Sequence, residues 1–331
     1  MHISYSRAQA YLSCPYKHYL GYVKGVKKAG VIRPLQFGTD FHKLLELRGD
    51  PKKLDEAKIA IGDTYYSLPS KFQTELGEDY LEALSVIFQD YCELYKDEPI
   101  PQKTEREFMI KLGTCKGEPI WFKGIIDELY LTKSKGEKHI KIGEHKTFNR
   151  RPDMNTLMMN SQKSLYSYAV LKLYGILPDE VIWDYIHSTP ASEPIWLENS
   201  HRFSTAKNTR ITPFSFKRAC QSKGITDPKV LQQASVYEEN VSNFFFRVHQ
   251  PVIPQMVNNV YESFLYTAKQ IALQGHKNKT KNLTRDCAYC DFQPLCHAEL
   301  TGANVDEFFE KEEFKIEPRE DLETWEKEDY C

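Results

Sequence analysis

The sequence predicts an α/β fold in which a mixed sheet is flanked by helices, and three observations support this prediction. Apolar and polar residues alternate over two adjacent runs within residues 124–146, as they do in a pair of strands. Apolar residues recur at helical spacing on both sides of those runs, over residues 37–47 and 155–174. A further apolar run at residues 181–187 predicts another strand, so strands and helices alternate as in a sheet covered by helices.

The remaining elements follow from the same patterns. The chain opens with a predicted helix over residues 4–20, with Ser6 as its N-cap and Gln9 completing a capping box. Residues 74–96 and 253–273 are predicted helices, and residues 105–112 are a predicted strand ahead of the hairpin. The hairpin turns over residues 133–138, which contain Ser134 and Gly136.

Charge is distributed unevenly along the chain. The 331 residues carry a net charge of −2, but residues 302–331 hold twelve acids and four bases, so residues 1–301 are net positive. A mildly basic body suits a protein that binds phosphate groups, and the acidic tail suits a spacer, a partner contact or a mimic of DNA charge.

The cellular compartment can be predicted from the absence of membrane-spanning and signal patterns. No run of eighteen apolar residues occurs, and the N-terminal residues have no basic-then-apolar signal pattern, so we expect a soluble cytoplasmic protein with no membrane contact. Eight cysteines are too few for a disulfide scaffold in a chain of this length.

The hairpin carries the residues with the most chemical interest. Antiparallel pairing brings Asp127 near Glu144, and Lys146 follows on the same face as Glu144. Two carboxylates this close favour a hard cation between them, namely Mg²⁺ or Mn²⁺, and the lysine is placed to position or deprotonate a water. The alternative is an ordinary amphipathic hairpin with solvated charges.

Two stretches without acids combine basic and aromatic residues. Residues 200–224 contain phenylalanines among basic side chains, as expected for contacts with single-stranded nucleic acid. A solvated loop is the alternative. The candidate DNA-binding residues, including those of a second basic stretch near residue 280, are Arg202, Lys207, Arg210, Lys217, Arg218, Lys277, Lys279 and Lys281.

Three cysteines, Cys287, Cys290 and Cys296, lie close together and need a fourth metal ligand. By spacing alone, zinc with Cys14 or a histidine and a [4Fe–4S] cluster with Cys14 both remain possible.

Several motifs resemble the RecB-like iron–sulfur branch of the PD-(D/E)XK nuclease superfamily, which includes the nuclease domains of AddB-type subunits and the CRISPR adaptation nucleases. The pattern G-x-x-D followed by (D/E)-x-K-T matches Gly124, Asp127, Glu144, Lys146 and Thr147. Other matches are G-x-x-x-H-x-x-L-E at residues 38–46, Q-x-x-x-Y at residues 162–166, an opening that includes Cys14-Pro15-Tyr16, and the closing cysteines followed by Phe292.

The resemblance implies a restriction-endonuclease-like core over residues 1–301, with an iron–sulfur subdomain from about 1–30 and 275–301, and an acidic tail over 302–331. It implies that His42, Asp127, Glu144 and the backbone carbonyl of His145 bind Mg²⁺ or Mn²⁺. Lys146 then orients the attacking water, Gln162 and Tyr166 hold substrate, and the four cysteines bind a structural [4Fe–4S] cluster. His145 departs from the aromatic or aliphatic side chain usual at its position, and its imidazole is expected either to be a spectator or to perturb Lys146.

The expected function is a metal-dependent DNA exonuclease acting on ends or single strands in recombination, repair or replication. The chain has no G-x-x-x-x-G-K-[ST] motif, so any helicase activity belongs to a partner. One alternative is a catalytically silent DNA-end-binding adaptor of a helicase–nuclease complex, against which the intact Asp127, Glu144 and Lys146 argue. Another is a zinc-stabilised RNA-binding module, which leaves the carboxylate hairpin unexplained.

Overall fold

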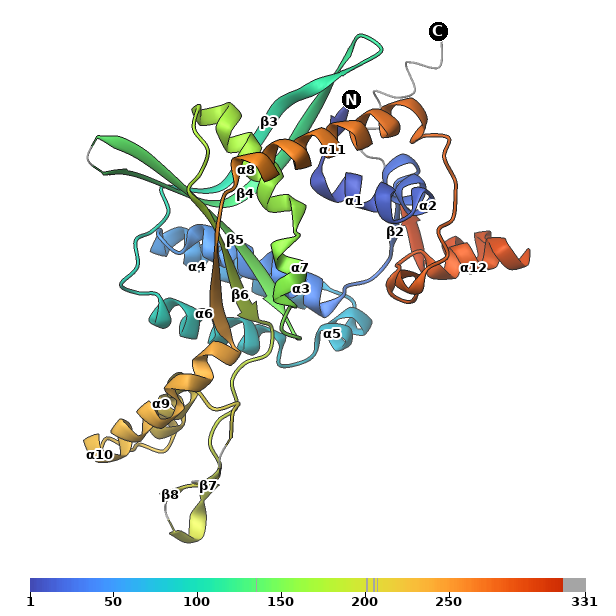
Figure 1. Ribbon diagram of the computed structural model, residues 1–331. Helices are drawn as coiled ribbons and strands as arrows, with labels where there is room; N and C mark the ends of the chain where they lie inside the picture. The colour runs from blue at the N-terminus through green and yellow to red at the C-terminus, as the bar shows by residue number, and fades with distance from the viewer. Residues whose placement is uncertain (135, 201, 205, 207, 318–331) are drawn as a thin grey trace.

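A six-stranded mixed sheet forms the centre of the computed structural model, which describes residues 1–317 except 135, 201, 205 and 207 (Figure 1). The order is β1-β4-β5-β6-β9, and β3 pairs with β4. The β1–β4 and β5–β6 pairs are parallel and the others are antiparallel, which confirms the predicted mixed sheet. Its strands are β1 (His2–Ile3), β3 (Lys103–Cys115), β4 (Glu118–Ser134), β5 (Glu137–Phe148), β6 (Glu180–His187) and β9 (Phe245–Pro251).

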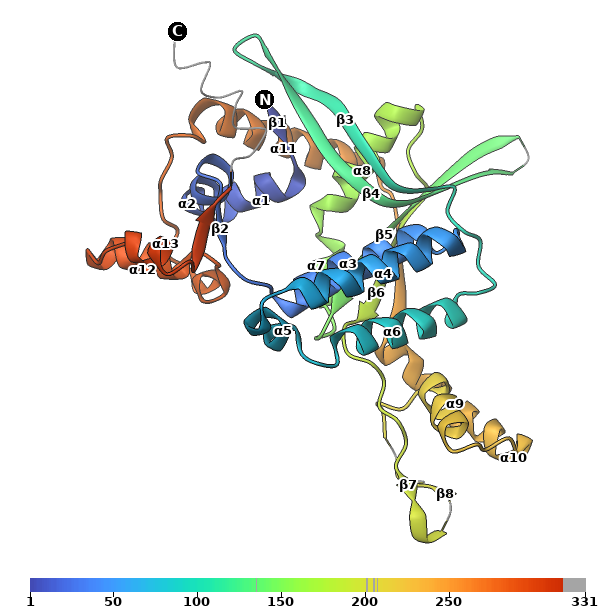
Figure 2. The ribbon, with the colours of Figure 1, turned by 180° about the vertical axis from the view of Figure 1, so that it is seen from behind.

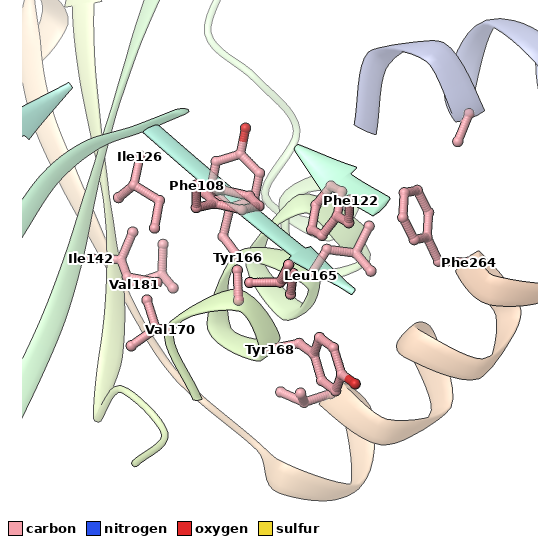
Figure 3. Close-up of a cluster of buried hydrophobic side chains, with 14 of the residues drawn as sticks. Phe108, Phe122, Ile126, Ile142, Leu165, Tyr166, Tyr168, Val170, Val181 and Phe264 are labelled. Carbon is pink, nitrogen blue, oxygen red and sulfur yellow. The ribbon is translucent and has the colours of Figure 1, made fainter. Parts of the chain in front are cut away.

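Helices cover both faces of this sheet. Helices α8 (Ser161–Tyr174) and α11 (Pro254–Gln274) pack on one face, where Phe122, Tyr166 and Phe264 belong to one buried apolar cluster (Figure 3). The opposite face is covered by α3 (Arg33–Leu47), α4 (Pro51–Ser67) and α6 (Tyr80–Leu94), as the reverse view shows (Figure 2). In the chain, the short helix α5 (Ser70–Leu76) lies between α4 and α6, and the short helix α7 (Met154–Met158) lies between β5 and α8.

The first and last described segments form a lobe beside the sheet (Figure 1). Strand β10 pairs antiparallel with β2, and a small apolar core that includes Tyr16, Phe292 and Phe314 joins the two segments. The lobe contains α1 (Tyr5–Ser13), α2 (Pro15–His18), a π-helix (Tyr19–Val23), β2 (Val26–Lys28), a 3₁₀-helix (Arg285–Tyr289), α12 (Gln293–Thr301), α13 (Asp306–Glu310) and β10 (Phe314–Ile316). Packed structure thus continues beyond residue 301 into the predicted tail, whose residues 318–331 lie outside the described part.

A second extension projects from the sheet between β6 and β9 (Figure 2). It has its own apolar core, which includes Phe203, Ile211 and Phe216. Its elements are β7 (Trp196–Leu197), β8 (Arg202–Phe203), α9 (Pro213–Ser222), α10 (Pro228–Leu231) and the 3₁₀-helices Glu198–Ser200 and Gln232–Asn243.

Three predicted helices are interrupted, each for a local reason. The helix predicted over 155–174 is divided into α7 and α8, because Asn160 is extended and caps the start of α8. The helix predicted over 4–20 breaks at Cys14, which is extended (φ −162°) because the following proline disfavours helical geometry there. The N-cap is Ser4, whose side chain accepts a hydrogen bond from the Arg7 amide, so the expected Ser6 cap is wrong. The helix predicted over 74–96 begins at Tyr80, because Gly77 adopts a positive φ of 95°.

Among the helices of the described residues, none is long and apolar enough to cross a membrane.

Candidate active site

Strand register brings the two predicted carboxylates together. The β4–β5 ladder pairs Glu128 with Gly143, so Asp127 and Glu144 are the next residues to face each other. One Asp127 oxygen, Oδ2, accepts a hydrogen bond from the backbone amide of His145 at 2.8 Å. The expected proximity of Asp127 and Glu144 is therefore confirmed, and the strands pair further than expected, through Ser134 and Glu137.

Helix α3 delivers His42 to the same place. Its Nδ1 lies 3.7 Å from Asp127 Oδ2 and 3.8 Å from Glu105 Oε1. One turn earlier, a Cβ on Gly38 would lie 3.3 Å from Thr147 Oγ1, so the glycine lets α3 approach β5 closely. The spacing of Gly38 and His42 thus has a physical basis in this contact.

Glu105 completes the cluster and was not among the sequence candidates. His42, Glu105 and Asp127 each offer a ligand atom within 4.8 Å of the others; no other such group of His, Cys, Asp or Glu occurs in the described chain. Glu105 has a left-handed φ of 44°, which is rare for a residue with a side chain. Glu107, the other glutamate of this strand, lies opposite Ile125 and is exposed. The β3–β4 ladder pairs Thr104 with Glu128 and Arg106 with Ile126, so Glu105 lies level with Asp127.

The Glu144 side chain is almost fully buried, and one of its two carboxylate oxygens lacks a hydrogen-bond partner among the described residues. Its Oε2 accepts hydrogen bonds from Gln162 Nε2 at 2.8 Å and Lys146 Nζ at 3.2 Å. Its Oε1 is buried and has no hydrogen-bond partner among the described residues. Burial, together with the negative charge of Asp127, raises the pKa of Glu144 to about 8. A cation at Oε1 would relieve both the missing contact and the repulsion, so these residues fit a divalent metal.

Lys146 stays charged beside Glu144. Burial on its own would lower the pKa of the Lys146 ammonium, but the charges of Glu144 and Asp127 outweigh burial and raise that pKa. Its Nζ also lies 5.7 Å from the centre of the Trp183 ring. A charged ammonium can hold a water by donating hydrogen bonds to it, but it cannot accept a proton.

Gln162 and Tyr166 occupy different environments although they share one face of α8. The side chain of Asn160 caps α8 by accepting from the Gln162 amide at 2.9 Å, which fixes the first turn beside Glu144. Tyr166 packs edge-on against Phe108, with ring centres 5.5 Å apart (Figure 3). A Cβ on Gly124 would lie 2.7 Å from Phe108 Cζ, so this core requires glycine there. Gln162 therefore lies at the pocket, whereas the Tyr166 ring is largely core.

The His145 imidazole lies between two buried carboxylates. Its Nε2 lies 3.1 Å from Glu128 Oε1 and its Nδ1 lies 3.3 Å from Asp184 Oδ2. Burial on its own would lower the pKa of this imidazole, but Asp184 and Glu128 outweigh burial and raise it to about 10. His145 is thus a buried cation that pairs with two carboxylates.

The four predicted sulfur ligands line one cavity of about 440 Å³. Cys14 lies at the break between α1 and α2. The other three cysteines lie more than 270 residues later: Cys287 in the 3₁₀-helix, Cys290 at its C-cap and Cys296 in α12. The backbone amide of Asn282 contacts Cys14 Sγ at 3.5 Å, and Cys287 Sγ contacts Asn282 O at 3.6 Å. Residues 1–30 and 275–301 thus meet around these thiols.

The basic residues of the extension differ in their contacts. Arg218 pairs with the buried Asp90 of α6, which ties the extension to the body. Arg210 lies 5.5 Å from the centre of the Phe244 ring and remains exposed, as are Arg202 and Lys217. Lys207 lies outside the described residues.

The second basic stretch lies beside the cysteine cavity. Lys281 pairs with Glu299 at 2.8 Å and lies 4.1 Å from the centre of the Tyr16 ring. Lys279 lies 4.8 Å from the centre of the Tyr19 ring. Both side chains therefore make contacts within the lobe. If they bind DNA, they do so while keeping these contacts.

Comparisons with known proteins identify the family. The chain is 21% identical over 362 aligned positions to an ATP-dependent helicase/deoxyribonuclease subunit of Staphylococcus haemolyticus (strain JCSC1435). That alignment covers 89% of this chain and 31% of the relative, so the chain spans about a third of the relative's length. A crystal structure described as SSO0001 matches 81% of this chain and 96% of its own, with 13% identity and a TM-score of 0.29, too low to bear on the fold. The profile of the PD-(D/E)XK nuclease superfamily matches residues 2–297. The chain therefore belongs to the PD-(D/E)XK nuclease superfamily.

Proposed function

We propose that this protein is a deoxyribonuclease that uses Mg²⁺ or Mn²⁺ to hydrolyse phosphodiester bonds at DNA ends or in single strands. The observation that carries the proposal is the unpartnered, buried Oε1 of Glu144 beside the cluster of His42, Glu105 and Asp127. A buried carboxylate oxygen without a partner is costly, and a hard cation is the ligand that its surroundings favour.

The metal would be held by His42, Glu105, Asp127, Glu144 and the backbone carbonyl of His145. When bound, it supplies Lewis-acid stabilisation of charge on the phosphoryl oxygens. Glu105 extends the ligand set expected from sequence, and its left-handed backbone supports a functional reason for its placement.

Lys146 would orient the attacking water. Its raised pKa keeps it protonated at neutral pH, so it acts as a hydrogen-bond donor and a positive charge near the phosphate. Gln162 would hold Glu144 and substrate, because its Nε2 already donates to Glu144 Oε2. Tyr166 would contribute through its packing in the core and, at its hydroxyl, through contact with the DNA backbone.

The four cysteines would bind a [4Fe–4S] cluster with a structural role. The support for this proposal is that the four thiols, taken from segments more than 270 residues apart, line one cavity together, as the family resemblance implies.

DNA would approach over the exposed basic side chains, and a helicase partner would supply unwinding. Arg202, Arg210, Lys217 and Lys277 are the described candidates that remain available for phosphates, and Lys207 joins them by sequence. The relative bears the name of a helicase/deoxyribonuclease subunit, which supports a helicase partner in DNA recombination or repair.

End-labelled linear DNA and closed circular single-stranded DNA distinguish the possible activities. An exonuclease degrades the linear substrate with Mg²⁺ or Mn²⁺, leaves the circle intact, and is inactive with chelator. Asp127→Ala should abolish cleavage, and Glu107→Ala, the control on β3, should retain it. DNA that is bound but never cut with either ion would instead support the silent adaptor.

A further inference from the structure

Strands β4 and β5, which both contribute to the metal pocket, also contribute neighbouring residues to a second polar cluster. Asp127 is followed by Glu128, and His145 lies between Glu144 and Lys146. Successive side chains of a strand point to opposite faces, so Glu128 and His145 lie on the face away from Glu144. Asp184 joins them from β6, where it is the register partner of His145.

One imidazole spans this second cluster. His145 Nε2 lies 3.1 Å from Glu128 Oε1 on β4 and Nδ1 lies 3.3 Å from Asp184 Oδ2 on β6. Neither ring nitrogen meets hydrogen-bond geometry with a described residue, so the ring connects three adjacent strands as an ion-pair partner. All three residues are at most 3% exposed. A Cβ on Gly143, opposite Glu128, would lie 2.8 Å from Glu128 Oε2, so the absence of a side chain there makes room for the carboxylate.

Two arginines close the cluster on the outside. Arg48, which caps the C-terminus of the helix that carries His42, lies 3.1 Å from Glu128 Oε1, and Arg247 on β9 lies 3.3 Å from Asp184 Oδ2. The Tyr91 hydroxyl also donates to Asp184. Each carboxylate thus has a partner besides His145.

Stability alone does not account for this arrangement. Buried ion pairs are often no more stabilising than apolar residues of similar volume, because removing charges from water is costly. What an apolar side chain at 145 would lack is the connection to both neighbouring strands. That connection matters locally, because the His145 amide donates to Asp127 Oδ2 at 2.8 Å.

We propose that His145 is a positioning residue: its ring, held between Glu128 and Asp184, fixes the β5 backbone so that Asp127 and Glu144 keep the geometry that binds the metal. This inference rests on the proposed function. It assigns the imidazole a role through the backbone, whereas the family resemblance concerns only the carbonyl of this residue.

Mn²⁺ affinity of the full-length protein, measured by the electron paramagnetic resonance signal of free Mn²⁺, tests the proposal without a cleavage assay. Outer-shell partners of metal ligands typically contribute roughly 10–100-fold in affinity, so we expect a loss of that size in His145→Leu. His145→Gln, which keeps an amide donor, should lie between His145→Leu and wild type. If His145→Leu does not fold, His145→Gln is the variant whose Mn²⁺ affinity tests the proposal.

Arg247→Met is the matched control. It removes a partner of the same Asp184 but touches neither β4 nor β5, so it should lower the melting temperature and leave Mn²⁺ affinity unchanged. The proposal is overturned if folded His145 variants bind Mn²⁺ like wild type, or if Arg247→Met loses as much affinity as they do. Wild-type protein that binds no Mn²⁺ would instead refute the proposed function.

Discussion

The carboxylate pocket and the cysteine cavity are assembled in different ways. In the pocket, Asp127 and Glu144 are adjacent in a strand ladder, and a backbone amide and the Gln162 side chain already hold them. In the cavity, Cys14 meets cysteines more than 270 residues away, and their sulfurs contact mainly backbone atoms.

The difference indicates what each metal would contribute. The pocket is held by the sheet, so a divalent ion would complete its chemistry and leave the fold largely unchanged. A cluster in the cavity would link Cys14 to cysteines far along the chain, and closing so long a loop would contribute to the free energy of folding. Loss of a ligand should therefore have opposite consequences for stability at the two places.

The largest expected effect of a single substitution is the loss of the metal cluster on replacing a cysteine. Cys14→Ser should bleach a brown protein, remove its iron and expose both ends of the chain to hydrogen exchange, because the link between the two segments is lost. Cys115→Ser on β3 is the control and should stay brown. Protein that is colourless, contains zinc without iron, and keeps that zinc in Cys14→Ser would rule out the cluster.

At the pocket, loss of a ligand should stabilise the metal-free protein. The pKa of Glu144 rises from 4.5 to about 8 on folding, so folding takes up a proton, and stability falls as pH rises from 4.5 to 8. Glu144→Gln removes this pH dependence and leaves a neutral group. We expect it to raise the free energy of unfolding of the metal-free protein by about 1–3 kcal/mol at pH 8 and to change it little at pH 4.

Chemical denaturation of metal-free protein at both pH values measures this difference. Glu144→Gln that is less stable than wild type at pH 8 would contradict the account of an unsatisfied, buried charge. Added Mn²⁺ should reverse the order at pH 8, since it stabilises only the protein that binds it.

The smallest expected effect concerns DNA binding. Replacing Lys277 and Lys279 by glutamine should weaken binding to all sequences alike and lower the salt slope by roughly 0.7 per lost single-strand phosphate contact. Fluorescence anisotropy between low and moderate salt measures that slope. An unchanged slope would mean that these lysines, one of which packs over Tyr19, serve only the lobe.

Sequence predicted what depends on strand pairing and helical spacing. Alternation over residues 124–146 was enough to place Asp127 beside Glu144, and i,i+4 spacing placed Gln162 and Tyr166 on one face of α8. The break at Cys14 was missed, although Pro15, which follows it, disfavours helical geometry at that residue.

What the sequence did not predict depends on tertiary contacts. Glu105 reaches the pocket through an irregular φ that no local pattern signals. The pairing of His145 with Asp184 required the order of strands in the sheet, which sequence left open. The ion pair of Arg218 with a buried aspartate from a distant helix is another tertiary contact that no local pattern signals. Helix α4 was missed altogether, since its surface is mostly exposed and its apolar periodicity is weak.

Single-turnover cleavage of end-labelled single-stranded DNA by Lys146→Ala tests the central claim most directly, namely that the β4–β5 pocket is a nuclease active site. With saturating Mn²⁺, we expect the rate to fall roughly 10²–10⁴-fold, as for loss of a group that handles the reacting water, with DNA affinity unchanged. Lys141→Ala, on the same strand and paired with Glu180, should cleave like wild type. Cleavage by Lys146→Ala at the wild-type rate would contradict the account.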